Sequence, residues 1–260
     1  MPNSIRVPRL LLTNDDGIDA PGLKALIQIA QDIAEEVWVI APEHDQSGTG
    51  QSISLHQPLR GWPRGERSWA IDGTPADCVA MAVSHFMAKA RPSFILSGIN
   101  AGANVGDEIN LSGTLGAAFT GLMLNIPSIA ISQAYGTSRQ DIRWDTAQAI
   151  APKLLRYFLT HAWHKDTCLS INIPDCDANL IKGFRWARSA INNIANIHID
   201  ERDDHREQKY FWLTLERRDH EPDNNSDAAI LENNQVAVTC LGSNRSITVD
   251  EPWHPFEDNS

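Results

Sequence analysis

Apolar runs and amphipathic stretches alternate along the first two thirds of the chain. The run Arg9–Thr13 has the length and composition of a buried strand, and a helix begins after it at Pro21. Apolar side chains then recur at steps of three and four residues, namely Leu23, Leu26, Ile27, Ala30 and Ile33. A second apolar strand, Val37–Ile40, completes a β-α-β unit. This unit predicts an α/β fold with parallel strands.

The alternation continues to about residue 173. Thr74, Pro75 and Asp77 carry the signals of a helix start, a capping box with proline at the first helical position. Further strands are expected at 93–96, 126–131 and 168–173, short extended pieces at 53–59 and 68–71, and helices from Ser112 and over 144–163. From about Ala187 the pattern changes to hairpins and an extended arm. We therefore predict an α/β catalytic domain over residues 1–186 and a β-hairpin region over 187–260 that serves oligomerisation.

Composition and charge narrow the class of protein. The 260 residues include 33 acidic and 22 basic side chains, a formal net charge of −11. A surface of this sign repels polyanions, so neither general nucleic-acid binding nor binding to an anionic membrane is expected. The apolar runs are shorter than the ~20 residues that cross a bilayer, and the first residues lack the apolar segment of a secretory signal. Four widely spaced cysteines fit reduced thiols in a cytoplasmic protein.

Two adjacent carboxylates, Asp15 and Asp16, follow the first predicted strand. Open α/β sheets bind ligands at the carboxyl ends of their strands, and neighbouring ionised carboxylates repel each other unless a cation or a shared proton is present. The alternative is that one carboxylate points into solvent while the other caps the helix near Pro21. The polar loops after the next strands favour a metal site, because Ser47 and Asn100 add oxygen atoms at the same edge. An all-oxygen set suits Mg²⁺, Mn²⁺ or Ca²⁺ rather than zinc.

A candidate anion site lies further along the chain. The glycine-rich stretch 97–108 leads to a helix that is expected to begin at Ser112-Gly113-Thr114. Free backbone amides and the helix dipole favour a negative group at such a start. A cation at Asp15 and Asp16 would offset the acidic field, so that the protein could hold a phosphorylated ligand.

Other catalytic motifs do not fit the sequence. A haloacid-dehalogenase phosphatase would place its nucleophilic aspartate at Asn14, and a neutral amide forms no aspartyl phosphate. The sequence has neither a Gly-x-Gly-x-x-Gly dinucleotide motif nor a P-loop, and Ser47 and Ser97 lack the Gly-x-Ser-x-Gly elbow. Metal-assisted catalysis therefore remains the interpretation that fits the polar residues at this edge.

Several ordered motifs together resemble the SurE survival-protein family. They are Leu11–Gly17 with Ala20–Gly22, Ala41-Pro42 with Ser47-Gly48, Asp72–Val79, Ser97–Asn104 and Ser112–Thr114, with Ile171–Asp175 as a weaker extension. The resemblance implies a Rossmann-like, three-layer α/β fold with a mostly parallel sheet. It also implies a C-terminal β-rich extension that is exchanged between the subunits of a homodimer or homotetramer.

The same resemblance implies a divalent-metal-dependent 5′-nucleotidase. Its substrates would be nucleoside 5′-monophosphates and often 3′-monophosphates, with polyphosphate as a side substrate. The implied ligands of one Mg²⁺ or Mn²⁺ ion, a site that Ca²⁺ could also occupy, are Asp15, Asp16, Ser47 and Asn100. The implied phosphate-binding residues are Asn104, Ser112, Gly113 and Thr114. Either Asp15 or Asp16 would serve as general base.

Two segments depart from the family pattern. Thr49–Ser52 stands where the family usually has Ala-Ser-Asn-Ser, and Asp250–Pro252 occupies the approximate place of a C-terminal histidine, to which His254 is not assigned. Both departures bear on substrate preference more than on the reaction. A regulatory protein that binds nucleotides without hydrolysing them is the alternative function, and a purely structural dimer is a third.

Overall fold

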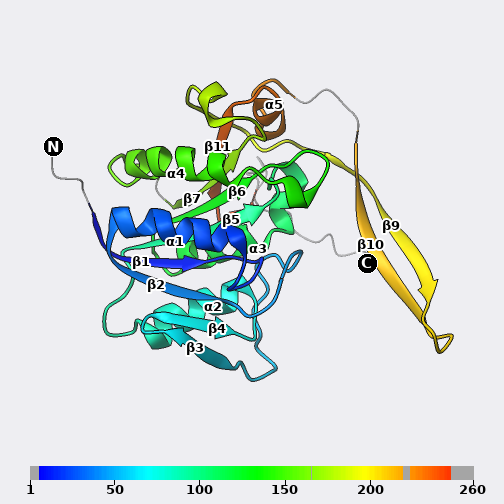
Figure 1. Ribbon diagram of the computed structural model, residues 1–260, viewed down its shortest axis with the longest axis horizontal. Coiled ribbons are helices and arrows are strands. Elements are labelled where there is room, and N and C mark those ends of the chain that lie inside the picture. Colours follow the sequence, from blue (N-terminus) through cyan, green and yellow to red (C-terminus); the bar gives the residue numbers. More distant parts are fainter. Residues whose placement is uncertain (1–5, 165, 219–222, 247–260) are drawn as a thin grey trace, which may run out of the picture.

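A computed structural model describes residues 6–164, 166–218 and 223–246. Its main feature is a nine-stranded sheet (Figure 1). The strand order is β3 (Gly61–Gly65), β4 (Ser68–Ile71), β2 (Ala34–Pro42), β1 (Val7–Thr13), β5 (Phe94–Ala101), β6 (Ser128–Gln133), β7 (Thr167–Ile173), β11 (Val236–Gly242) and β8 (Phe184–Trp186). The strands from β4 to β7 in this order are parallel, whereas β3 and β11 run antiparallel to β4 and β7. The predicted mostly parallel α/β fold is confirmed.

Helices cover both faces of the sheet. The helices α1 (Pro21–Ile33) and α4 (Trp144–Phe158) pack on one face, and α2 (Pro75–Met81) and α3 (Gly113–Met123) pack on the other. Because side chains alternate across a strand, Leu10 and Leu12 of β1 face the first pair of helices while Leu11 faces α2. The shorter helices are η1 (Ala82–Phe86), η2 (Gly106–Asn110), η3 (Arg139–Asp141), η4 (Ala178–Leu180) and α5 (Asp227–Glu232).

The path of the chain reverses at the centre of the sheet. From β1 the chain passes to β2 and β4 on one side, and it then crosses through α2 to β5 on the other side of β1. In this architecture, such a reversal marks the carboxyl ends of the two central strands, here β1 and β5, as the usual ligand site.

The C-terminal part contributes both a hairpin and strands of the main sheet. The strands β9 (Ile194–Asp203) and β10 (Lys209–Arg217) form an antiparallel two-stranded sheet that projects from the α/β body (Figure 1). In contrast, β11 pairs with β7, and α5 packs beside it. The expected β-rich extension is therefore present, although β11 also completes the core sheet. The domain boundary between residues 186 and 187, which falls at the end of β8, stays a prediction.

Some predicted elements differ in the structure. Residues 53–59 form no strand, because the Asp77 carboxylate accepts hydrogen bonds from the Ser54 amide at 2.9 Å and the Ser54 hydroxyl at 2.8 Å. The helix expected over 144–163 ends at Phe158, where the hydroxyl of Thr160 donates to carbonyl oxygens of the last turn at 2.9 Å. The segment 250–252 and His254 lie outside the described residues. Throughout the described part of the chain, every helix is too short or too polar to cross a membrane.

Candidate active site

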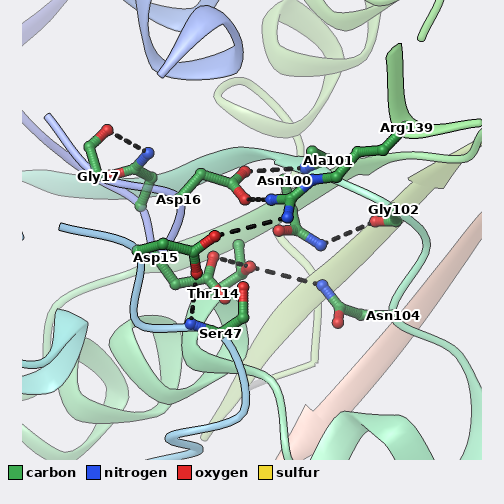
Figure 2. Close-up of polar contacts among 12 residues, drawn as sticks. Asp15, Asp16, Gly17, Ser47, Asn100, Ala101, Gly102, Asn104, Thr114 and Arg139 are labelled. Carbon is green, nitrogen blue, oxygen red and sulfur yellow. Dashed lines mark hydrogen bonds and ion pairs between the residues drawn. The ribbon is translucent and has the colours of Figure 1, made fainter. Parts of the chain in front are cut away.

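The predicted site residues gather at the carboxyl edge of the central strands. Asp15 and Asp16 follow β1, and Ser47 lies in the loop after β2. Asn100 lies near the end of β5, which pairs with the opposite side of β1. The side chains of these residues lie close together in Figure 2, beside Asn104 and Thr114.

Asp15 is a buried acid, only 3% exposed. The Thr114 hydroxyl donates a hydrogen bond of 2.5 Å to Asp15 Oδ1, and the Gln46 amide donates one of 2.7 Å to the Asp15 carbonyl oxygen. Burial raises the pKa of Asp15 to about 6, the bond from Thr114 acts in the opposite direction, and the charge of Asp16 adds to the rise. A carboxylate held in this way gains stability from any cation placed beside it.

Asp16 is partly buried and has two donors. The Ala101 amide donates to Asp16 Oδ2 at 2.9 Å, and the Arg139 guanidinium forms an ion pair with Asp16 Oδ1. Burial raises the pKa of Asp16, although the bond from Ala101 and the charge of Arg139 oppose the rise. Arg139 also reaches Asp45 Oδ2 at 3.5 Å. Asp45 has a lowered pKa, because hydrogen bonds from Ser47 and the charge of Arg139 outweigh the effect of its burial.

A local irregularity of β5 positions Asn100. The register between β5 and β6 shifts between Ser97 and Asn100. At Gly98, which has a φ of +137°, a Cβ would lie 2.3 Å from the Ile131 carbonyl oxygen, so the strand passes here only with glycine. The side-chain amide of Asn100 then donates to the Gly102 carbonyl oxygen at 2.8 Å, which fixes the orientation of the Asn100 side chain.

Asn104 is held by a buried polar network. The side chain of Asn172, on β7, forms two hydrogen bonds with the backbone of Asn104. The Asn104 amide donates to Asn172 Oδ1 at 2.8 Å, and Asn172 Nδ2 donates to the Asn104 carbonyl oxygen at 3.1 Å. The Asn104 side chain donates to Ser132 Oγ at 2.9 Å and to Thr114 Oγ1 at 3.5 Å. Because Thr114 also contacts Asp15, the network links Asn104 to the acidic pair.

The N-terminus of α3 faces the same acidic pair. Ser112 is the N-cap of α3, and its hydroxyl accepts a hydrogen bond from the Leu115 amide at 3.1 Å. A Cβ at Gly113 would lie 2.8 Å from Asp15 Cβ and 3.0 Å from Asp15 Oδ2, so the helix start lies directly against Asp15. The structure thus brings a pair of carboxylates and a helix start together, as the sequence predicts.

Comparison with known proteins identifies the family. A family model described as "Survival protein SurE" matches residues 10–196, well over half of the chain. The chain belongs to the SurE family. The protein named 5′-nucleotidase SurE 1 of Burkholderia lata is 45% identical over 238 residues, which cover 92% of this chain and 92% of that protein. The 5′-nucleotidase SurE of Methylorubrum populi is 41% identical over 245 residues, covering 94% and 95%.

A solved SurE structure confirms the architecture. The SurE protein from Aquifex aeolicus matches with a TM-score of 0.79 at 30% sequence identity, covering 92% of this chain and 95% of that one. The predicted family and fold class are therefore both confirmed for this SurE-family chain.

The site of this SurE-family chain suits a hard divalent cation. Within the described residues, no group of three or more His, Cys, Asp or Glu side chains is arranged to hold an ion. The oxygen-bearing side chains that lie together at this edge are two carboxylates, Asp15 and Asp16, and the side chains of Ser47 and Asn100 (Figure 2). Burial raises the pKa of both carboxyl groups, and a guanidinium already pairs with Asp16. This part of the site therefore attracts positive charge, and a set of oxygen ligands fits Mg²⁺ or Mn²⁺.

Sequence reasoning missed several residues of this SurE-family site. Asn172 and Ser132 hold Asn104, and Arg139 joins Asp16 to Asp45. Asn172 lies in the weak motif Ile171–Asp175. Its position near the end of a predicted strand was the signal in the sequence that could have placed it at the site. Arg139 follows β6, another strand that ends at this edge. Its contact with Asp16 and Asp45 depends on the path of the loop after β6, which the sequence pattern does not predict.

Proposed function

We propose that this SurE-family protein is a divalent-metal-dependent phosphomonoesterase that hydrolyses nucleoside 5′-monophosphates to nucleoside and phosphate. The names of its relatives support the nucleotidase activity. The observation that carries the proposal is the hydrogen bond between Thr114 and Asp15, because it joins the acidic pair to the start of α3. Hydrolysis of 3′-monophosphates and polyphosphate is part of the same proposal.

Each residue has a separate task in the proposed reaction. Asp15, Asp16, Ser47 and Asn100 would hold one Mg²⁺ or Mn²⁺ ion, which supplies charge stabilisation to the phosphoryl group and a more acidic water. The amides at the start of α3, with the side chains of Ser112 and Thr114, would bind the phosphate oxygens. Asn104 would complete the cradle, since its side chain already contacts Thr114.

One of the two carboxylates would take the proton from the attacking water. Asp15 and Asp16 both lie at the proposed ion site, and burial raises the pKa of each, which strengthens each carboxylate as a proton acceptor. Asp16 already has donors on both oxygen atoms, whereas Thr114 donates to Oδ1 of Asp15. The proposal assigns the base to this pair.

Phosphate release from purified protein tests the proposal. The chelator-stripped chain should release phosphate from a panel of nucleoside monophosphates only after Mn²⁺ or Mg²⁺ is added, with sugar phosphates and polyphosphate as comparison substrates. Asp15→Ala or Asp16→Ala should abolish this release, whereas Asp19→Ala, at an exposed position of the same loop, should retain it. Full activity in either site variant would contradict the proposal. Nucleotide binding without turnover would favour the regulatory alternative.

The hairpin supports a further part of the proposal, a homodimer or homotetramer with exchange of C-terminal segments. Residues on β9 and β10 that expose large apolar side chains are Ile197, Ile199, Tyr210, Phe211, Trp212, Leu213 and Leu215. A second copy of the chain would remove this surface from water. The region 187–260 would then be the oligomerisation region, and the cytoplasm remains the expected location.

A further inference from the structure

Arg139 places a permanent positive charge beside two carboxylates of the site, Asp16 and Asp45. It lies in η3, within the segment that connects β6 to α4. Its guanidinium pairs with Asp16 through Nη2 (Figure 2). The same guanidinium approaches Asp45 Oδ2 to 3.5 Å through Nη1. The two carboxylates come from different loops, after β1 and β2. One arginine from a third loop therefore bridges them.

The contact has an electrostatic cause. The side chain of Asp16 is only 6% exposed, so its charge is poorly solvated. The charges of Asp16 and Asp45 act to raise the pKa of Asp15, and Asp45 also acts to raise that of Asp16. In contrast, Arg139 acts to lower the pKa of Asp16 and of Asp45. The guanidinium thus offsets a concentration of negative charge, which is also the role of a divalent ion.

We propose that Arg139 is a positioning residue that competes with the divalent cation for Asp16 and thereby sets the affinity of the site for that ion. The inference rests on the proposed function, because it takes Asp16 as a ligand. An arginine keeps its charge at any ordinary pH, so it repels a dication held by the same carboxylate. The Arg139 side chain is 48% exposed, and its long stem leaves it free to turn toward solvent when the ion binds.

Arg143 offers a matched control on the same segment. It pairs with Asp175 at 3.1 Å and with Asp177 at 2.7 Å, and its side chain is 46% exposed. It therefore resembles Arg139 in exposure and in the number of acidic partners. Its partners follow β7 and are not assigned to the ion. Loss of its charge changes the net charge of the protein equally, but it does not free Asp16.

Binding of Mn²⁺ to the chelator-stripped full chain tests the proposal without any activity measurement. Free Mn²⁺ is measured by electron paramagnetic resonance during titration of wild type, Arg139→Gln, Arg139→Lys and Arg143→Gln. Removal of the competing charge in Arg139→Gln should tighten the Kd roughly three- to tenfold. Arg139→Lys keeps the positive charge and should give a Kd closer to that of wild type than Arg139→Gln does, and Arg143→Gln should stay within about twofold of wild type.

The possible results separate this inference from the proposed function. A Kd for Arg139→Gln that equals or exceeds the wild-type value overturns the inference, while binding by wild type still supports the metal site. Equal tightening in Arg139→Gln and Arg143→Gln also overturns it, because the effect would then come from net charge alone. Failure of all four proteins to bind Mn²⁺ overturns the inference together with the metal dependence of the proposed function.

Discussion

Asp15 shows how the burial of one carboxyl group makes the stability of the fold depend on pH. Its pKa is about 6 in the folded chain without an ion, against an ordinary value of 3.8. A raised pKa means that the folded state binds the proton more tightly than the unfolded state. The stabilisation from this proton is fully present below pH 3.8 and is lost as the pH rises through about 6. Near neutral pH, the charged Asp15 therefore destabilises the folded state, and a cation at the proposed site would offset this cost.

The stability of Asp15→Asn as a function of pH tests this reasoning. The variant keeps an oxygen that can accept the Thr114 hydrogen bond but carries no charge. In chelator-stripped protein, the free energy of unfolding of wild type should fall relative to that of Asp15→Asn between pH ~4 and pH ~7. Urea unfolding at a series of pH values measures the difference. Asp19→Asn, at an exposed position, is the control. If the free energies of unfolding of wild type and Asp15→Asn changed with pH in parallel, the pKa of Asp15 would not be raised in the folded chain.

At the level of single helices, the start of α3 depends on the absence of a side chain. The helix reaches Asp15 because residue 113 is glycine, and Pro75 of α2 also lies near, with its Cγ 3.2 Å from the position of a Cβ. A methyl group has no room between these neighbours, so either Asp15 or the helix start would have to move. The contact between α3 and the Asp15 carboxylate therefore requires glycine at position 113.

Gly113→Ala should separate activity from folding. Displacement of Asp15 or of the α3 amides by up to about 1 Å should lower kcat/KM for a nucleoside monophosphate by about one to two orders of magnitude. The protein should remain folded by circular dichroism. Gly65→Ala in the edge strand β3, where the nearest atom to the new Cβ is 3.6 Å away, should retain wild-type activity. Wild-type kcat/KM in Gly113→Ala would show that the close approach is not needed.

The capping box of α2 was predictable because its signals are local. Thr74 accepts from the Asp77 amide at 3.1 Å, and Asp77 accepts from the Thr74 amide at 3.0 Å, as the spacing predicts. The sequence did not reveal that Asp77 also holds Ser54, since that contact joins segments 23 residues apart. The same tertiary contact explains why residues 53–59 form no strand.

Asp77→Ala should therefore cost more stability than the loss of a cap alone. It removes the Asp77 half of the capping box and two bonds to Ser54, so the free energy of unfolding should fall by about 2 kcal/mol. Thr74→Ala removes the other half and the bond that the Thr74 hydroxyl donates to the Ser52 carbonyl oxygen at 2.6 Å, and it should cost about 1.5 kcal/mol. Chemical denaturation of both variants measures the difference. The control is Asp145→Ala in the exposed first turn of α4, which should cost about 0.5 kcal/mol or less. A loss of only about 1 kcal/mol in Asp77→Ala, the cost of a cap alone, would mean that the bonds to Ser54 add nothing.

Across the whole molecule, the order of strands explains which parts of the site were predictable. Asp15, Asp16 and Asn100 lie at strand ends, and a parallel sheet places such ends at one edge whatever the details of the loops. Arg139 reaches the same place through a connecting segment whose path depends on tertiary packing. Likewise, β11 joins the sheet beside β7, a pairing between distant segments that hydrophobic periodicity does not encode.

The projecting hairpin has one aliphatic face, while Tyr210 and Trp212 lie on its other face, and the aliphatic face leads to a prediction about assembly. Leu213 lies opposite Ile199 and Leu215 lies opposite Ile197, so these four side chains and Phe211 share one side of the two strands. Leu213 is 68% exposed in the single chain. Each large apolar side chain that a second copy covers contributes roughly 1.5–3 kcal/mol to association.

Leu213→Glu should break the assembly, because a charge in the covered face would lose its hydration without a partner. Multi-angle light scattering at one protein concentration should give a dimer or tetramer mass for wild type and a smaller mass for Leu213→Glu. Thr214→Glu adds the same charge at the neighbouring position, on the opposite face of β10, and should keep the wild-type mass. A monomeric wild type would contradict the proposed assembly, and equal masses for wild type and Leu213→Glu would place the contact elsewhere than this face.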